Sequence, residues 1–260
     1  MISQVKRIPT NNLALALSGG AARGAFHLGI LDFCEEYKIE IKAYSGSSIG
    51  AIISASHASG ISAKEQLKIF SSKDVRQALK FNYFRNGLLK IDSSNKIIKE
   101  LLPIEKLEDI PKPVWVNAYD LKKKELHYFN SGDTVTLCLA SSALVPLFKP
   151  IAYEGMNLID GGLFDNIPIR PLLDKNYDIY AIDLFAKENE IKTKNFNPLR
   201  NIKKSLFKQL HENHKHSLEN TNYYLGSKHI RNFSLFTFKE LEQCFNLGIK
   251  EAQNHFLDIL

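Results

Sequence analysis

Hydrophobic runs and regularly spaced apolar positions alternate over the first 60 residues. Residues 13–17 form an unbroken apolar run between polar residues and glycines, which is typical of a strand buried on both faces of a sheet. Apolar residues then recur at helical spacing from 25 to 37. A second strand over 39–43 precedes a small-residue helix that starts at 51 and stops at Gly60. This order predicts a strand–helix–strand–helix unit with a right-handed crossover in a parallel sheet.

The rest of the chain continues the alternation and then becomes polar and helical. Residues 61–110 are expected to be helical and rich in loops, and a polar linker starts at 187. Beyond these, the expected elements are a hairpin (113–121 with 124–129), a short helix (134–143), strands (156–159 and 179–184), an amphipathic helix after 197, and a closing helix that begins with a capping-box pattern (237–240). We expect an α/β domain over 1–186 and a helical extension over 187–260, packed on or beside it.

Length and composition narrow the class of protein. A chain of 260 residues suits one large α/β domain, and 44% hydrophobic with 24% charged residues is ordinary for a soluble globular enzyme. No apolar run has the length of a transmembrane helix, and the basic N-terminus lacks the apolar stretch of a signal peptide. Cys34, Cys138 and Cys244 show no metal-ligand spacing, so they are interpreted as small buried side chains in a reducing compartment. We expect a cytoplasmic protein.

The net charge of +6 is unevenly distributed. Residues 187–215 contain eight lysines and arginines but only three glutamates, a balance that can attract an anionic lipid surface or nucleic acid. A solvated helix face is the simpler interpretation, and no nucleic-acid partner is predicted. An apolar stripe from Leu199 to Leu218 is compatible with a bilayer surface, a homodimer contact or packing on the domain.

A serine inside Gly-x-Ser-x-Gly is the strongest chemical signal. Ser48 follows the second predicted strand and precedes a helix, a position that lifts its hydroxyl out of the sheet toward the helix N-terminus. Gly46 and Gly50 are expected because a Cβ at either place would collide with the folded backbone, and one turn residue is expected to have an unusual φ. The alternative is a serine that only caps the helix.

The segment Ser18–Ala25 follows the first strand with mostly small residues. Such a loop leaves backbone N–H groups unblocked and forms a site for an anion, either a phosphate or the oxyanion of a tetrahedral intermediate. It lacks the Gly-Lys-Ser/Thr ending of a nucleoside triphosphate loop, and Ala21 replaces the second glycine of a dinucleotide-binding pattern. By itself, the segment leaves nucleotide and oxyanion open.

Asp160 ends a predicted strand and is followed by Gly161 and Gly162. This placement holds the carboxylate at the sheet edge, where it can act as the base for a serine hydroxyl without a histidine. A turn-stabilising aspartate is the alternative. The loop glycine Gly19 and Ser48 are separated by the length of one strand–helix–strand unit, so both are expected at the same edge of the sheet.

In this order, the segments Ser18–Gly24, Gly46–Gly50 and Asp160–Gly162 resemble the three motifs of patatin-like phospholipases. The segments Ala140–Ala143 with Pro146, Asn166–Pro168 and Asn117–Leu121 are also similar to bacterial members. The resemblance runs from about Leu13 to Leu184, and the C-terminal quarter resembles no known family.

The resemblance implies a three-layer α/β/α fold with a mainly parallel central sheet, a Ser–Asp dyad, and hydrolysis of lipid acyl esters without a metal or other cofactor. It makes Ser48 the nucleophile and Asp160 the base. It assigns the oxyanion hole to the backbone N–H groups of Gly19, Gly20 and Ala21, with Arg23 helping to hold the loop. Ala21 stands where plant members often carry glycine, a mild departure because an N–H donor needs no particular side chain. The supporting motif glycines are Gly24, Gly46, Gly50, Gly161 and Gly162.

Other polar residues are less suited to these roles. His27 and His57 are interpreted as packed or capping residues, because triad histidines of serine-elbow hydrolases follow the acid in the chain. The cluster His211–His216 lacks partners at metal-ligand spacing. Asp183, which also ends a strand, is the second choice for the base. Asp165 is expected to shape the turn into the next helix, with Asn166 as a cap.

Two apolar clusters, Phe81–Phe84 and Val145–Phe148, are candidates for contact with an acyl chain, although each is more typical of core. The leading hypothesis is hydrolysis of phospholipid or lysophospholipid esters by Ser48 and Asp160. The alternatives are a phosphate- or nucleotide-binding protein, a lipid-binding regulatory protein with little turnover, and an esterase or thioesterase on non-lipid substrates.

Overall fold

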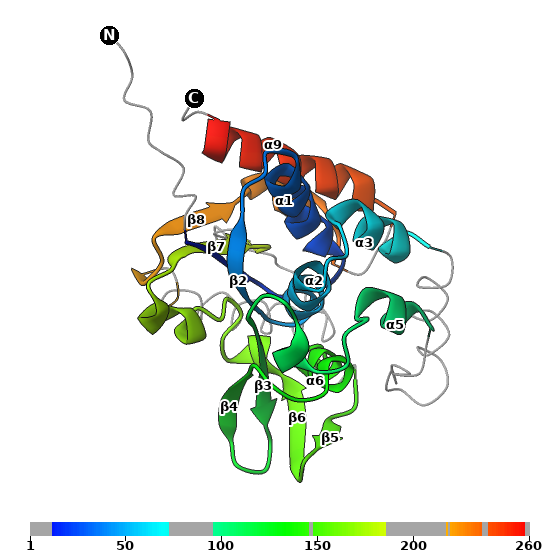
Figure 1. Cartoon of the computed structure of the whole chain (residues 1–260). Helices are drawn as coiled ribbons and strands as arrows, with labels where there is room; N and C mark the ends of the chain where they lie inside the picture. The colour runs from blue at the N-terminus through cyan, green and yellow to red at the C-terminus, as the bar shows by residue number, and fades with distance from the viewer. Residues whose placement is uncertain are drawn as a thin grey trace, which may run out of the picture.

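The computed structural model describes residues 12–72, 96–145, 148–185, 217, 219–235 and 239–257. Their strands form one mixed sheet with the order β5-β6-β3-β2-β1-β7-β8, and β4 pairs with β3 outside this path (Figure 1). Helices flank the sheet, as expected for an α/β fold. Cys34, Cys138 and Cys244 are buried free thiols, as predicted.

The central strands are parallel. β1 (Leu13–Leu17) pairs in parallel with β2 (Ile41–Gly46) on one side and with β7 (Asp178–Asp183) on the other. Beyond them, β3 (Val114–Asp120) pairs in parallel with β2, and β8 (Tyr223–Gly226) with β7. All five residues of β1 are buried, which explains why this strand is a continuous apolar run without alternation.

The other side of the sheet is antiparallel. β4 (Glu125–Phe129) forms the predicted hairpin with β3, and β6 (Met156–Asp160) pairs antiparallel with both β3 and β5 (Ile151–Tyr153). Val116 pairs with β2 and with β4, so these two strands lie on opposite edges of β3. Ala118 pairs with β4 and with β6, so β6 also lies on the edge opposite β4. β2 and β6 therefore lie along the same edge of β3. β2 ends at Gly46 opposite Val116, and β6 ends at Asp160 opposite Ala118. The ends of these two strands therefore face each other.

Helices cover one face of the sheet. They are α1 (Gly24–Glu36), α2 (Ile49–Ala58), α3 (Ala63–Phe70), α5 (Lys96–Leu101), α6 (Thr134–Ser141) and α9 (Leu241–Leu257). The larger hydrophobic core lies between them and the odd-numbered residues of β1, such as Leu15. On the opposite face, Ala14 and Ala16 pack with Ile167, Ile169 and Leu172, at and before the 3-10 segment η4 (Arg170–Lys175).

The C-terminal part contributes to both the sheet and a helical layer. α9 packs along α1 (Figure 1), and two glycines allow the close contact: a Cβ on Gly29 would overlap the carbonyl oxygen of Phe245, and one on Gly248 would overlap that of Phe26. Strand β8 was not predicted from the sequence, because a four-residue strand at the sheet edge has too little apolar pattern to be distinguished from a loop.

Several sequence predictions lie outside the described residues. They are the apolar cluster 81–84, residues 146 and 147, the basic region 187–215 with its linker, the apolar stripe 199–218, the histidines at 211, 214 and 216, and the start of the capping-box pattern at 237. Within the described residues, no helix combines the length and hydrophobicity needed to cross a bilayer.

Candidate active site

Ser48 lies at a strained turn between β2 and α2. Its backbone angles are φ 52° and ψ −123°, in a region of positive φ that non-glycine residues rarely adopt. Such a conformation costs on the order of 1–3 kcal/mol and persists only where the surrounding structure enforces it. The unusual φ expected from the sequence therefore belongs to Ser48 itself.

The two motif glycines make this turn possible. A Cβ on Gly46 would overlap the backbone of Gly50 and Ala51, and a Cβ on Gly50 would overlap the carbonyl oxygen of Leu17. The collisions predicted from the sequence are confirmed at both positions. The turn therefore packs directly against the start of α2 and the end of β1. At Gly46 and at Gly50 there is no room for a side chain.

Asp160 ends β6 and contacts the side chain of Ser48. Its carboxylate accepts a hydrogen bond from the N–H of Gly162 at 2.8 Å, and an interaction with the side chain of Ser48 also favours its ionised form. The residue is only 6% exposed. Burial outweighs these two interactions and raises the pKa of the carboxyl group from 3.8 to about 7. A group with this pKa can both take up and return a proton near neutral pH.

The loop after β1 brings the first motif against Ser48. A Cβ built on Gly19 would lie 3.1 Å from the Cβ of Ser48. The N–H groups of Gly20 and Ala21 have no hydrogen-bond partner among the described residues. Gly19 differs from the sequence expectation, because its N–H donates to Oδ1 of Asn166 at 3.1 Å. Two of the three expected amides are therefore unpaired, and the third is already engaged.

Arg23 fastens this loop to two distant segments. Its Nε donates to the carbonyl of Phe233 at 2.8 Å, and its Nη1 donates to the carbonyl of Leu184 at 3.0 Å, just after β7. Gly24, the first residue of α1, lies against Ile49, the first residue of α2; a Cβ there would be 2.6 Å from Cγ1 of Ile49. These contacts join the loop to the segments after β7 and β8 and to the start of α2.

Asn166 has a different role from the one expected. It was predicted as a helix cap, but η4 begins after Ile169, which makes no side-chain cap. Instead, Oδ1 of Asn166 accepts from the N–H of Gly19, and Nδ2 donates to the Gly19 carbonyl at 3.5 Å. A Cβ on Gly162 would be 2.8 Å from the same Oδ1. Asn166 thus links the third motif to the first.

Ser141 contacts the turn of Ser48 directly and Asn117 contacts it through Ser141, and the sequence alone assigns neither residue a role. The N–H of Ser48 donates to Oγ of Ser141 at 2.9 Å. Oγ of Ser141 in turn lies 3.4 Å from Oδ1 of Asn117, whose Nδ2 donates to the carbonyl of Asp165 at 2.6 Å. The turn is therefore connected by hydrogen bonds to the segment that follows Asp160.

A comparison with known families found a match that spans the three motifs. The model of a family described as patatin-like phospholipase matches residues 15–173, which contain all three motifs. The chain belongs to this family. The resemblance inferred from the motifs is therefore confirmed.

The relatives of this patatin-like chain include proteins from bacteria and fungi. An uncharacterized NTE family protein of Mycobacterium bovis is 27% identical over 188 residues, which are 71% of this chain and 52% of that protein. Lysophospholipase NTE1 of Coccidioides immitis is 30% identical over 188 residues, 70% of this chain and 12% of that protein. The patatin-like chain thus spans about half the length of the mycobacterial relative and about an eighth of the fungal one.

Solved structures support the fold. VipD from Legionella pneumophila aligns with 95% of this chain and 67% of its own, at a TM-score of 0.55 and 16% identity. The type III effector protein ExoU aligns with 95% of this chain and 53% of its own, at a TM-score of 0.51 and 18% identity. At these identities, the similarity is evidence for the shared patatin-like fold alone.

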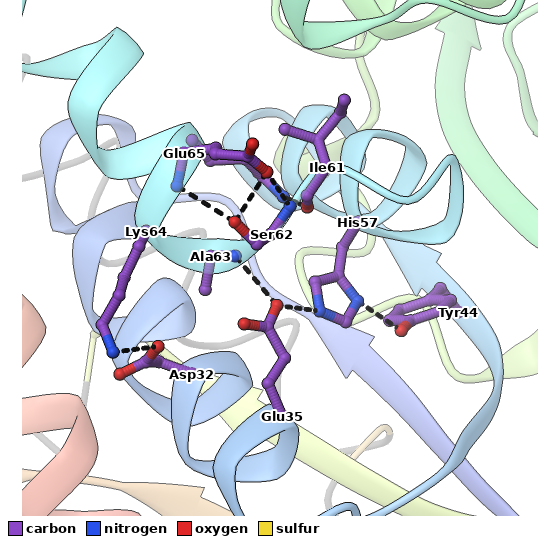
Figure 2. Close-up of polar contacts among 10 residues, drawn as sticks. Asp32, Glu35, Tyr44, His57, Ile61, Ser62, Ala63, Lys64 and Glu65 are labelled. Atoms are coloured by element: carbon purple, nitrogen blue, oxygen red, sulfur yellow. Dashed lines mark hydrogen bonds and ion pairs between the residues drawn. The ribbon is translucent and has the colours of Figure 1, made fainter.

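The two histidines near the motifs of the patatin-like chain are packed residues, as expected. His57 lies at the end of α2 opposite to Ser48, where Nδ1 is 2.6 Å from the Tyr44 hydroxyl and Nε2 is 2.9 Å from Oε1 of Glu35 (Figure 2). The same Glu35 oxygen accepts from the N–H at the start of α3. His27 is fully buried, its Nε2 is 2.9 Å from the Ser18 carbonyl oxygen, and burial lowers its pKa to about 4.

Two other buried aspartates, Asp183 and Asp165, are engaged in structural hydrogen bonds. Asp183, the second choice for the base, accepts from the N–H of Phe185 at 2.8 Å and from the hydroxyl of Tyr224 at 2.9 Å. Asp165 accepts from the hydroxyl of Tyr128 at 2.6 Å. Both carboxylates hold neighbouring segments in place.

Proposed function

We propose that the chain is a serine acyl hydrolase that cleaves acyl ester bonds of phospholipids or lysophospholipids with a Ser48–Asp160 dyad. The family description and the lysophospholipase among its relatives support the reaction class. The observation that carries the proposal is the interaction between the side chain of Ser48, at a strained turn, and the buried carboxylate of Asp160. This arrangement fits an activated nucleophile and its base.

The reaction has two halves. Asp160 takes the hydroxyl proton as Oγ of Ser48 attacks the ester carbonyl. The tetrahedral intermediate then collapses, the alcohol leaves with the proton from Asp160, and an acyl-serine remains. In the second half, Asp160 takes a proton from a water molecule that attacks the acyl-serine. Collapse of this intermediate releases the fatty acid and returns the proton to Ser48.

We assign stabilisation of the oxyanion to the N–H groups of Gly20 and Ala21. Both belong to the loop that contacts Ser48, and both lack a partner among the described residues. Gly19 has a positioning role, because its N–H is engaged by Asn166. Preorganised amides of this kind contribute about 10²–10³-fold to the rate of acyl transfer.

Contact with an anionic membrane is part of the proposal. The ester substrate resides at a lipid surface, and the net charge of +6 favours an anionic one. Sedimentation with vesicles of phosphatidylcholine alone and with added phosphatidylglycerol, at low and high salt, tests this contact. Binding that needs the anionic lipid and weakens with salt is expected, whereas equal binding to both vesicles would contradict it.

The central experiment measures fatty-acid release by mass spectrometry from lysophosphatidylcholine and from mixed phospholipid vesicles. Ser48→Ala is expected to abolish release, and Asp160→Asn to reduce it by about 10²–10⁴-fold. Ser47→Ala and Asp183→Asn are the matched controls: the first makes the same change at the neighbouring serine, and the second makes it at another aspartate that ends a strand. A fluorophosphonate probe should label wild-type protein at Ser48 and leave Ser48→Ala unlabelled.

The alternatives give different outcomes. A phosphate- or nucleotide-binding protein would not take the label at Ser48. A regulatory lipid-binding protein would sediment with vesicles without releasing fatty acid. Turnover of a short-chain nitrophenyl ester or a thioester without lipid hydrolysis would favour a non-lipid substrate. Full activity of Ser48→Ala or Asp160→Asn would remove the dyad from the proposal.

A further inference from the structure

The turn that carries Ser48 is connected to the Asp160 segment by two buried polar side chains, Ser141 and Asn117. We infer that this pair are positioning residues, which hold the Ser48 turn in the conformation that aims its hydroxyl at Asp160. The inference rests on the proposed function, because it assigns a task within that site. It adds two residues from elements outside the three motifs, α6 and β3.

The hydroxyl of Ser141 is held in one orientation. Its Oγ accepts from the N–H of Ser48 at 2.9 Å, so its proton is free to point toward Oδ1 of Asn117, 3.4 Å away. Ser141 and Asn117 are both fully buried, which keeps water from replacing either partner. The N–H of Ser48 thus has a fixed acceptor on the side of the turn that faces α6.

Asn117 lies between the two halves of the site. It precedes Ala118, which pairs with Asp160 in the sheet, and its Nδ2 donates to the carbonyl of Asp165 at 2.6 Å. Gly161 packs directly on it, since a Cβ there would be 2.6 Å from Cγ of Asn117. A movement of Asn117 would therefore shift the loop after Asp160 and the acceptor of the Ser48 N–H together.

Ser48 needs such a constraint because of its backbone conformation. A residue at φ 52° and ψ −123° relaxes toward ordinary angles unless several contacts oppose the change. Rotation of this peptide would move Oγ away from Asp160. Misplacement of a reacting atom by about 1 Å can slow a reaction about 10²-fold.

The test compares consecutive serines. Ser141→Ala removes the acceptor of the Ser48 N–H, whereas Ser142→Ala removes a hydroxyl that only donates to the Cys138 carbonyl at 2.9 Å. We expect Ser141→Ala to lower kcat and the rate of fluorophosphonate labelling by about 10- to 100-fold, with little change in KM. Ser142→Ala should match the wild type, and Ser141→Thr, which keeps the hydroxyl, should recover most of the rate.

Hydrogen exchange gives a readout that does not require activity. In Ser141→Ala, the peptide containing the Ser48 amide should exchange faster, while peptides from α9 remain unchanged. Asn117→Ala should give the same pattern, and its effect on kcat should not add to that of Ser141→Ala, because both act through one contact. If Ser141→Ala does not fold, Asn117→Ala and Ser141→Thr are compared in its place.

The outcomes separate this inference from the proposed function. Wild-type kcat and wild-type exchange of the Ser48 amide in Ser141→Ala would overturn the inference and leave the dyad intact. Additive losses in the double variant would also overturn it. A wild-type protein that neither hydrolyses esters nor reacts with the probe would refute the proposed function, while hydrogen exchange would still test whether the pair holds the turn.

Discussion

The buried carboxyl group of Asp160 interacts with the side chain of Ser48, and its pKa is raised to about 7, chiefly by burial. A base works only in its ionised form, so protonation of Asp160 below pH 7 removes the group that would accept the serine proton. The value of kcat/KM, which follows the free enzyme, should therefore rise with pH and level off above about 8.

At pH 6, one unit below this pKa, kcat/KM should be about tenfold lower than its plateau. Initial rates with a short-chain nitrophenyl ester between pH 5 and 8.5 measure this profile, after correction for spontaneous hydrolysis. A profile that is flat over the same range would mean that the base titrates well below neutrality.

The same ionisation affects stability. The carboxyl titrates at 3.8 when unfolded and at about 7 when folded, so the folded protein binds the extra proton between these values. Stability should fall as pH rises through this window, by at most about 4 kcal/mol for this group. Asp160→Asn removes the effect, so its Tm relative to the wild type should be higher at pH 8 than at pH 4.5. Thermal unfolding measures both differences.

Ser48→Ala serves as the comparison for this stability effect. It removes the hydroxyl but keeps the carboxyl group, so its Tm should depend on pH in the same direction as that of the wild type. If Asp160→Asn and the wild type showed the same dependence on pH, another group would have to account for it.

The contact between Gly19 and Ser48 supplies a separate prediction. In Gly19→Ala, the added methyl would lie 2.7 Å from Oδ1 of Asn166 and 3.1 Å from the Cβ of Ser48. Relief of this contact moves either the first loop or the serine, so activity should fall by about 10- to 100-fold. Gly60→Asn is the control, because its site is open and asparagine tolerates a positive φ. Equal loss of activity in both variants would contradict the prediction.

The sequence pattern was sufficient to predict the elements and turns whose contacts lie between residues close in the sequence. The apolar run of β1, the spacing of α1 and the collision at Gly46 follow from neighbouring residues, and each agrees with the structure. The approach of Gly19 to Ser48 follows from a single parallel pair of strands, β1 and β2. These inferences needed only the backbone geometry of one strand–helix–strand unit.

Contacts between distant residues could not be derived in the same way. Asp160 reaches the Ser48 turn because β6 pairs with one particular edge of β3. These two strands are separated by about 40 residues in the sequence, so local pattern does not determine which edge β6 takes. Asn166 accepts a hydrogen bond from Gly19, which is 147 positions away in the sequence, and Ser141 accepts one from Ser48, which is 93 positions away. The segments containing Asn117 and Ser141 are distinguished in the sequence only by their family resemblance, which does not state what a side chain contacts, and the cap predicted at Asn166 is wrong.

The crossing of α1 and α9 provides a prediction about the C-terminal part. In an exposed helix, replacing glycine with alanine is stabilising by about 0.5–1 kcal/mol. At Gly29 and Gly248 the sign should reverse, because a Cβ at either position would overlap a carbonyl oxygen of the facing helix. Each substitution should cost about 1–3 kcal/mol and lower Tm by roughly 2–10 °C.

Thermal unfolding of Gly29→Ala and Gly248→Ala measures this cost, with Gln253→Ala on the exposed side of α9 as the control. Because neither glycine belongs to the three motifs, the folded fraction of each variant should keep its rate of fluorophosphonate labelling. The two losses should not be additive, since either methyl alone already forces the helices apart. A Tm that rises in either variant would mean that α9 does not pack on α1 at this distance in solution.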